Sequence, residues 1–205
     1  MADRPIALSV AFYGGLSGLA GLIAAWRGQS LQWASSPWLG WPSPAMATGV
    51  SLALGAVLAL VAVLGARWSV RRYGWARTLH VELRRLLGPL PVPTALAFAL
   101  TSALGEELLF RGALQPWLGY VPASVLFGLL HVGPDRRFVP WTVQAVGMGF
   151  ALGAIVQVSG VLWGAVLAHA VVNFVNLRFL ASHDPANDDG AALPPSLVAR
   201  RERRA

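Results

Sequence analysis

Six long apolar segments constrain the fold of this chain more than any other feature. They cover residues 6–26, 45–66, 93–114, 120–131, 139–158 and 161–180. A helix needs about 20 apolar residues to cross the hydrocarbon core of a bilayer, and all of these segments except 120–131 have about that length. Backbone polar groups in lipid must be satisfied within the segment, which favours helices. The sequence therefore predicts an all-α, polytopic membrane bundle of about six transmembrane helices.

The composition leaves little room for a separate soluble domain. Of the 205 residues, 56% are hydrophobic and only 12% are charged, which is unlike a soluble domain. We expect residues 1–183 to form a single transmembrane domain, and residues 184–205 to form a disordered, arginine-rich cytoplasmic tail. The chain has no cysteine, which excludes disulfides and thiolate sites.

The net charge of +7 is better explained by membrane orientation than by nucleic acid as a partner. With the amino terminus assigned to the cytoplasm, all arginines except Arg27 and Arg111 fall in cytoplasmic segments. The positive-inside rule then places both termini in the cytoplasm. The tryptophans, including Trp141, lie near predicted helix ends and indicate aromatic belts at the two interfaces. We expect a multi-pass protein of a bacterial plasma membrane, with the lipid bilayer as a partner.

An amphipathic segment separates the second and third apolar segments. Its leucines recur at helical spacing among arginines, at Leu79, Leu83, Leu86 and Leu87. This pattern predicts a helix on the cytoplasmic membrane surface, anchored to anionic lipid. A regulatory or substrate-docking role is the alternative. His80 in this segment and His183 after the last apolar segment are expected to be solvated.

Ionisable side chains inside the apolar segments are the main clue to function. A charge near the bilayer centre costs about 2.5 to 3.5 kcal/mol on insertion scales, so a chain that keeps several must turn them inward and use them. The third segment contains Glu106, Glu107 and Arg111, the next ends at His131, and the last contains His169. Four-residue spacing predicts that Glu107 pairs with Arg111, which leaves Glu106 free to act. A purely structural ion network is the alternative.

The two histidines suit complementary tasks. A neutral imidazole at His131 can hold or deprotonate water. His169 and Asn173 share one helical face, and both can donate hydrogen bonds to an oxyanion. The helical rise places Glu106 and both histidines at similar depth in the outer half of the bilayer. We interpret Asn176 and Gln144 as packing or cavity-lining groups.

These residues form three motifs that resemble those of a known family. The patterns are Glu-Glu-x-x-x-Arg, Phe-x-x-x-His and His-x-x-x-Asn, at 106–111, 127–131 and 169–173. In this order they are similar to the intramembrane proteases called CPBP or Abi, which include the CAAX prenyl endopeptidase of eukaryotes. The resemblance covers the last four apolar segments and implies an intramembrane endopeptidase.

The resemblance also implies a role for each residue. Glu106 would be the general base, and His131 would be its partner on the water. His169 and Asn173 would stabilise the tetrahedral oxyanion. Two further side chains would orient the site: Glu107 and Arg111.

A metal cofactor is an open question at this level. Glu106, His131 and His169 could together form a catalytic zinc site. The sequence has no His-Glu-x-x-His, however, and asparagine is a poor zinc ligand. We therefore favour a metal-free, glutamate-activated water, with zinc as the alternative.

The substrate is expected to be a protein with a membrane-associated segment. The outer-half depth favours an exported or membrane-anchored protein presented from the external side, and the resemblance implies substrates such as a protein with a carboxy-terminal sorting signal. Two functions of other classes remain as alternatives. One is an ion transporter that uses the intramembrane charges, and the other is a non-catalytic immunity or scaffold protein.

Overall fold

The computed structural model describes residues 3–32 and 37–185, and its regular elements there are helices, with no sheet. The all-α prediction is confirmed, whereas nearly all of the predicted tail, 184–205, lies outside the described residues. The elements are α1 (Asp3–Arg27), α2 (Pro44–Arg72), α3 (Gly74–Leu87), α4 (Val92–Glu107), η1 (Leu108–Leu114), α5 (Gln115–Leu118), α6 (Tyr120–Leu129), η2 (Arg136–Phe138), α7 (Val139–Ser159) and α8 (Trp163–Ser182).

Among the described residues, five helical stretches are long and apolar enough to cross a membrane. They are Arg4–Arg27, Pro44–Arg72, Val92–Leu118, Arg136–Ser159 and Trp163–Ser182. The chain is therefore a multi-pass membrane protein. The third stretch is continuous through α4, η1 and α5, and it extends beyond residue 114, where the sequence pattern placed its end.

The predicted fourth span, 120–131, is instead a half-length helix. α6 has 10 residues, or about 15 Å, half of a hydrocarbon core of about 30 Å. Gly133 and Pro134 follow, and proline disfavours a helical conformation in the residue before it. The chain continues through 130–135 without a helix until η2. Such backbone is tolerated inside a membrane protein where it lines a cavity, as His131 does here.

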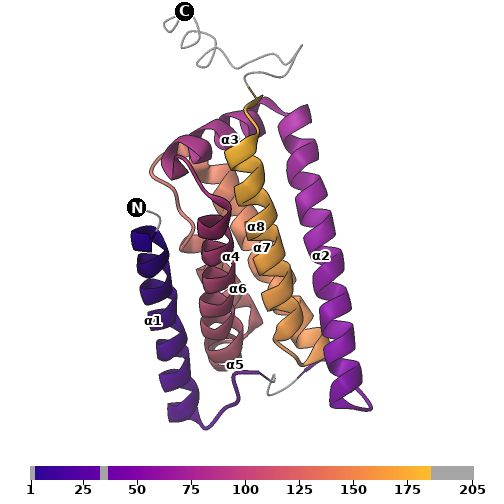
Figure 1. The fold of residues 1–205 in the computed structure, drawn as a ribbon. Coiled ribbons are helices and arrows are strands. Elements are labelled where there is room, and N and C mark those ends of the chain that lie inside the picture. The colour runs from indigo at the N-terminus through magenta and orange to yellow at the C-terminus, as the bar shows by residue number, and fades with distance from the viewer. Residues whose placement is uncertain (1–2, 33–36, 186–205) are drawn as a thin grey trace, which may run out of the picture.

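The helices pack around α8. It contacts α2 and α4 extensively and α7 less, while α6 packs along α7 and α1 packs along α4. Figure 1 shows that α1 begins and α8 ends on the side of the bundle where α3 lies. This arrangement agrees with termini on one side of the membrane, although their assignment to the cytoplasm stays a prediction.

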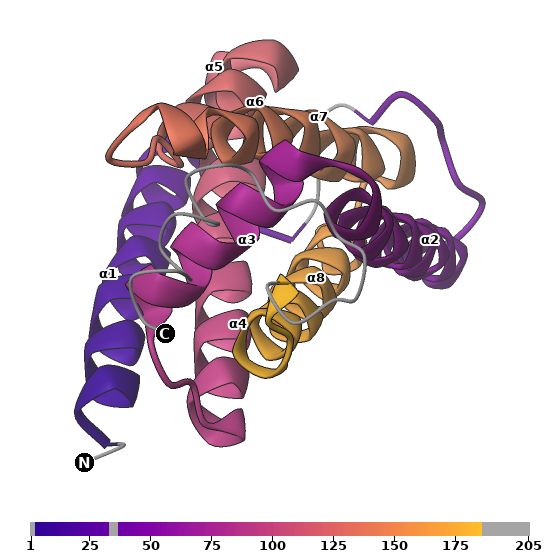
Figure 2. The same cartoon turned by 90° about the horizontal axis from the view of Figure 1, so that it is seen from above.

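α3 crosses one end of the bundle, as the view along the bundle shows (Figure 2). Leu79 is buried, and Leu83, Leu86 and Leu87 line an internal cavity. The amphipathic helix predicted from the leucine spacing is therefore present. Its leucines contact the protein interior at Leu79 and the cavity at Leu83 and Leu87, while Leu86 is also 64% exposed; anchoring to anionic lipid stays a prediction.

Polar contacts fasten α3 to the end of α8. Arg84 Nη1 donates to the carbonyls of Leu180 at 2.6 Å and Ala181 at 2.7 Å, which are among the last carbonyls of the helix and have no intrahelical partner. His80 is only 4% exposed, and its Nε2 donates to the His183 carbonyl at 2.9 Å. The expectation that His80 is solvated was wrong, because burial against α8 outweighs the polar character of the segment.

Glycines bring helices close together next to the ionisable residues. A Cβ on Gly149 of α7 would lie 2.5 Å from the Ser124 carbonyl oxygen of α6, and one on Gly105 of α4 would lie 2.7 Å from the Tyr13 carbonyl oxygen of α1. Both distances are far below van der Waals contact, so only glycine permits these approaches. They set the positions of the helices that hold Glu106 and His131.

Candidate active site

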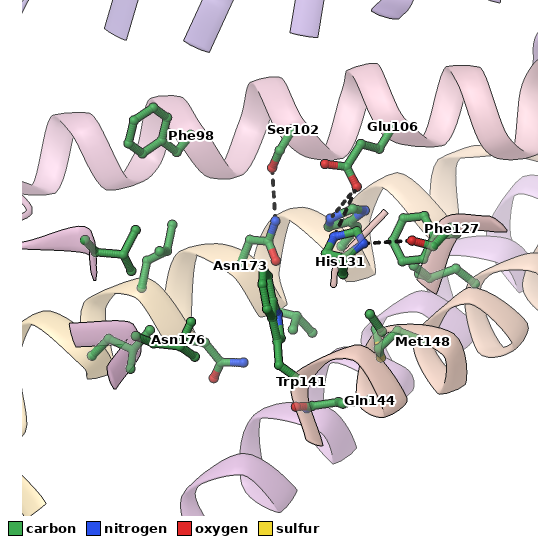
Figure 3. Close-up of a pocket in the computed structure, with 18 of the residues that line it drawn as sticks. Phe98, Ser102, Glu106, Phe127, His131, Trp141, Gln144, Met148, Asn173 and Asn176 are labelled. Carbon is green, nitrogen blue, oxygen red and sulfur yellow. Dashed lines mark hydrogen bonds and ion pairs between the residues drawn. The ribbon is translucent and has the colours of Figure 1, made fainter. Parts of the chain in front are cut away.

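Ionisable side chains from three parts of the bundle meet at a cavity of about 450 Å³. Glu106 lies at the end of α4, His131 just after α6, and His169 in α8. Figure 3 shows Glu106 pointing from its helix toward the His131 imidazole. The side chains of these residues are 12%, 22% and 7% exposed.

A buried ion pair lies directly behind the cavity. Arg111 Nη1 donates to Glu107 Oε1 at 3.2 Å, with side chains 1% and 0% exposed. Arg111 Nη2 donates to the Gly149 carbonyl at 3.1 Å, and the guanidinium lies 4.2 Å from the centre of the Phe127 ring. The pairing predicted from four-residue spacing is thus present. It joins η1 to α6 and α7.

Arg111 lies in a π-helical turn that the sequence pattern did not indicate. η1 (Leu108–Leu114) follows Glu107 without a break, and apolar periodicity alone suggests an uninterrupted α-helix there. π turns inside α-helices are rare and frequently occur at functional sites. Here the turn begins immediately after the two adjacent carboxylates.

Glu107 also fixes the orientation of His169. The Nδ1 atom of His169 lies 2.7 Å from Glu107 Oε1. Since Glu107 is paired with Arg111, its carboxylate is an acceptor and Nδ1 carries the hydrogen. In the neutral ring Nε2 then presents a lone pair. That atom lies 4.0 Å from Glu106 Oε2.

The backbone of α6 fixes the orientation of His131 in the same way. His131 Nδ1 lies 2.8 Å from the Phe127 carbonyl, so Nδ1 is the donor. Nε2 again presents a lone pair in the neutral ring, at 3.7 Å from Glu106 Oε2. The Trp141 ring packs edge-on against this imidazole, with centroids 5.5 Å apart.

Glu106 therefore faces two acceptor nitrogens. Its Oε2 is buried and has no hydrogen-bond partner among the residues that the structure describes. The two Nε2 atoms are too far away for direct hydrogen bonds. A water molecule has two hydrogens to donate, so it can bridge the Glu106 carboxylate and an Nε2 atom that are too far apart to bond directly. The arrangement can hold a water between Glu106, His131 and His169.

Asn173 adds an amide next to this cluster. Its Nδ2 donates to Ser102 Oγ at 3.0 Å (Figure 3), and Ser102 Oγ donates to the Ala99 carbonyl at 3.4 Å. Ser102 thus fixes which way the carboxamide points, and the second Nδ2 hydrogen stays available. Sequence reasoning missed Ser102, because a serine in a helix commonly bonds only to its own backbone.

The structure brings together all six residues singled out by the motifs. Four of them line the cavity: Glu106, His131, His169 and Asn173. Glu107 and Arg111 support them from behind. Trp141, expected in an interfacial belt, also lines the cavity, because it lies in the first turn of α7, directly after the non-helical segment 130–135 and η2.

The cavity runs from the ionisable cluster toward α3. Its lining in α4 extends from Glu106 back to Phe98, and its lining in α8 extends from His169 forward to Leu180. Both directions lead to α3, whose leucines form the far end. Access from the external side, expected from the sequence, stays a prediction. Glu106 also falls near the middle of the 27-residue span Val92–Leu118, because the helix ends later than the apolar pattern suggested.

Glu106, His131 and His169 are the candidate metal ligands of the cavity. Two imidazole nitrogens and a carboxylate are chemically a zinc donor set. Within residues 3–32 and 37–185, however, no three His, Cys, Asp or Glu side chains are arranged so that they could hold a metal ion.

Comparison with known proteins agrees with the motifs. The chain is 28% identical over 129 residues to the uncharacterized protein YpbD of Bacillus subtilis. The aligned residues make up 62% of this chain and 64% of that protein. No solved structure matches the chain significantly. Residues 88–175 match the family model described as type II CAAX prenyl endopeptidase Rce1-like, which includes all three motifs. The family predicted from the motifs is confirmed, and residues 88–175 form a domain of the Rce1-like type II CAAX prenyl endopeptidase family.

Proposed function

We propose that this chain is an intramembrane endopeptidase that hydrolyses a peptide bond with water activated by Glu106 and His131. The observation that carries the proposal is the buried, unpartnered Glu106 Oε2 facing the Nε2 atoms of two histidines. Each histidine is held in place through its Nδ1 atom. Two fixed acceptors beside a carboxylate orient a water for proton abstraction, which is the geometry of general base catalysis.

In the first step, Glu106 takes a proton from the water as the water oxygen attacks the scissile carbonyl carbon. His131 Nε2 accepts the other hydrogen of the water and so aims its lone pair. The carbonyl π bond opens, and its electron pair becomes the oxyanion of a tetrahedral intermediate. Positioned general base catalysis typically contributes about 10² to 10⁴ in rate.

The oxyanion is stabilised from α8. Asn173 offers the Nδ2 hydrogen that Ser102 does not use. His169 has its Nδ1 hydrogen on Glu107, so it donates through Nε2 only as an imidazolium, which forms when a proton from solvent binds Nε2 before the attack; the water is then held by Glu106 and His131 alone. The Glu107 carboxylate lies where it compensates the charge of that form, as the carboxylate of a catalytic triad does.

The intermediate then collapses with Glu106 as the acid. The proton taken from water passes from Glu106 to the leaving nitrogen, and the carbon–nitrogen bond breaks. The products are a carboxylic acid and an amine, and Glu106 is again a carboxylate. The same side chain serves as base and acid, so no further titratable group is required.

We propose that the substrate is a membrane-associated protein segment that enters from the α3 side. Two observations support this side: the cavity lining leads from Glu106 to α3, and α3 lies where α1 begins and α8 ends (Figure 1). If the termini are cytoplasmic, as the arginines predict, the scissile bond is presented from the cytoplasmic face. An externally presented substrate, expected from the sequence, is the alternative.

The test compares membrane proteomes of the native host carrying wild-type protein, Glu106→Gln or Glu82→Gln. Glu106→Gln keeps the shape of the side chain but removes the base, while Glu82 of α3 lies outside the cluster. We expect a protein that retains a terminal segment only with Glu106→Gln. Identical protein termini in all three strains would contradict proteolysis. A Glu106-dependent proton flux in liposomes without any cleavage would favour ion transport instead.

A further inference from the structure

One face of α8 presents a row of polar side chains to the cavity. His169, Asn173 and Asn176 are spaced at i, i+4 and i+7, and all three line the cavity. His169 and Asn173 have assigned partners in Glu107 and Ser102. Asn176 is the third member of the row and lies nearer to α3 (Figure 3).

The Asn176 carboxamide is left with an unused acceptor. Its Oδ1 atom is one of four buried side-chain atoms that have no hydrogen-bond partner in the described part of the chain; the other three belong to Glu106, Glu107 and Gln115. Of the four residues, only Glu106 and Asn176 line the cavity. Leaving a buried acceptor unpaired costs about 1 to 3 kcal/mol. The position of Asn176 therefore indicates a donor that arrives with a ligand.

The spacing along α8 indicates which donor fits. Seven residues of helix separate Asn176 from His169, or about 10 Å along the axis. An extended peptide advances about 3.3 Å per residue. A peptide whose scissile carbonyl lies beside Glu106 and His169, and which runs along the cavity toward α3, therefore passes Asn176 about three residues away. Its backbone N–H groups are the donors available at every position.

The rest of the cavity near Asn176 suits an extended apolar chain. Its neighbours on α8 are Leu177 and Leu180, and the leucines of α3 form the adjoining wall. These apolar surfaces bury side chains of the peptide but have no side-chain acceptor for its amides, and the other carboxamide of the lining that has no assigned partner, Gln144, comes from α7 on a different wall. A peptide amide that loses its hydrogen bond to water against such a surface and finds no acceptor is costly. Asn176 supplies the missing acceptor.

We propose that Asn176 binds the substrate main chain by accepting a backbone N–H about three residues from the scissile bond. The inference rests on the proposed peptidase function and adds a subsite to it. Asn176 is a positioning residue: it acts on the register of the peptide, and Glu106 acts on the bond. Because Asn176 bonds to a backbone N–H and not to a side chain, it acts on apolar peptides of any sequence.

The experiment replaces single amides of a peptide by esters, which removes one N–H donor at a time. The probe is a fluorescein-labelled, ten-residue Leu–Ala peptide, bound in detergent to the Glu106→Gln protein so that cleavage does not interfere. One ester position should weaken binding about 2- to 10-fold, the worth of one net hydrogen bond. With Asn176→Ala added, that ester should have no further effect. With Asn176→Asp, which keeps an acceptor, the ester effect should return.

Controls separate this subsite from general effects. Gln157→Ala removes a carboxamide from α7 outside the cavity and should leave the ester profile as in the parent protein. An ester profile that is flat, or that is unchanged by Asn176→Ala, would overturn the proposal. Failure of the all-amide probe to bind would overturn it as well, because a backbone subsite requires no special side chain. Binding is measured without turnover, so a protein that binds in this way but cleaves nothing would contradict only the proposed peptidase function.

Discussion

The orientations of two histidines determine what Glu106 can do. Both imidazoles use Nδ1 on fixed acceptors, the Phe127 carbonyl for His131 and the Glu107 carboxylate for His169. Their Nε2 atoms therefore face Glu106, and a water that donates one hydrogen to Glu106 and the other to His131 has a lone pair free for attack. The catalytic potential of the cluster thus depends on contacts outside the reacting atoms.

Ser102 provides the first test of that dependence. It accepts from Asn173 Nδ2, so Ser102→Ala frees the carboxamide to rotate. Losing an oxyanion donor outright costs about 10² to 10³ in rate, and a donor that is only misoriented should cost less. We expect kcat for Glu106-dependent cleavage to fall about 10-fold with little change in KM. Ser102→Thr, which keeps the hydroxyl, should restore it; an unaltered kcat in Ser102→Ala would contradict the assigned role.

The Arg111–Glu107 pair is expected to matter for stability as well as for catalysis. Removing one partner of a buried ion pair leaves an uncompensated charge and typically costs about 3 to 5 kcal/mol. Arg111→Met should therefore lower the thermal unfolding midpoint in detergent strongly. Arg85→Met is the matched control, since the Arg85–Glu82 bridge is exposed and such bridges contribute about 0 to 1 kcal/mol. Equal shifts for both variants would show that the buried pair is not a structural frame.

At the residue scale, the sequence identifies the charged residues of the site but not the neutral ones. Glu106, Arg111 and the histidines stand out because ionisable groups in apolar helices are costly. Ser102 and Asn176 carry no such cost, so nothing in the sequence separates them from ordinary packing residues. The partner of Ser102 is Asn173, which lies 71 residues away and reaches it only when α4 and α8 come together.

At the scale of elements, the close contact between α6 and α7 holds His131 in place. Arg111 and Ser124 both donate to the Gly149 carbonyl, so the backbone of α7 at this point is part of the site. Sequence periodicity identified α7 but not the half-length of α6 or the π turn of η1. Both features lie in segments whose apolar pattern is that of an ordinary helix. Periodicity carries no information on the tertiary contacts that shorten a helix or change one of its turns.

Two neighbouring glycines of α7 allow a matched test of this contact. Gly149→Ala would place a Cβ 2.5 Å from the Ser124 carbonyl oxygen, and such overpacking typically costs about 1 to 3 kcal/mol. Gly147 has no other described atom within 4 Å of an added Cβ, so Gly147→Ala should be neutral or stabilising by up to about 1 kcal/mol. We expect only Gly149→Ala to lower both the unfolding midpoint and the cleavage rate. Similar behaviour of the two variants would argue against a close α6–α7 approach.

The junction of α3 and α8 should loosen in acid. Burial lowers the pKa of His80, although its hydrogen bond to the His183 carbonyl opposes this shift. The unfolded chain therefore binds a proton more readily than the folded one, and stability falls as pH drops below about 6.5, the ordinary histidine value. A single group contributes at most about 1.4 kcal/mol per pH unit.

Hydrogen exchange of the α3 amides at pH 7 and pH 5 measures this effect directly. His80→Gln keeps a donor for the His183 carbonyl without a titrating ring, so α3 of this variant should exchange less pH-dependently than wild type after correction for intrinsic exchange rates. His131 and His169 are present in both proteins and cancel in the comparison. Equal pH dependence of the two proteins would exclude His80 as the sensitive group.

At the scale of the whole molecule, the arginine distribution and the helix order support each other. The short α6 and the extended segment 130–135 together return the chain once, so α1 begins and α8 ends on the same side (Figure 1). The number of chain reversals predicted from the apolar segments was therefore right even though one predicted span is not a full helix. The depth of the site in the bilayer stays a prediction, and it depends on where the third span ends, which the structure extends to residue 118.

A chain without cysteine allows access to the cavity to be tested with single introduced thiols. Leu86 lies on α3, lines the cavity and is 64% exposed, so Leu86→Cys should react with a bulky, membrane-impermeant maleimide. If substrate enters past α3, this label should abolish cleavage, because it occupies the route to Glu106. Ser30→Cys, which follows the opposite end of α1, should react from the other face of oriented vesicles and leave cleavage intact. Full activity of the labelled Leu86→Cys protein, or inhibition by the label at Ser30→Cys alone, would place substrate entry at the other end of the bundle.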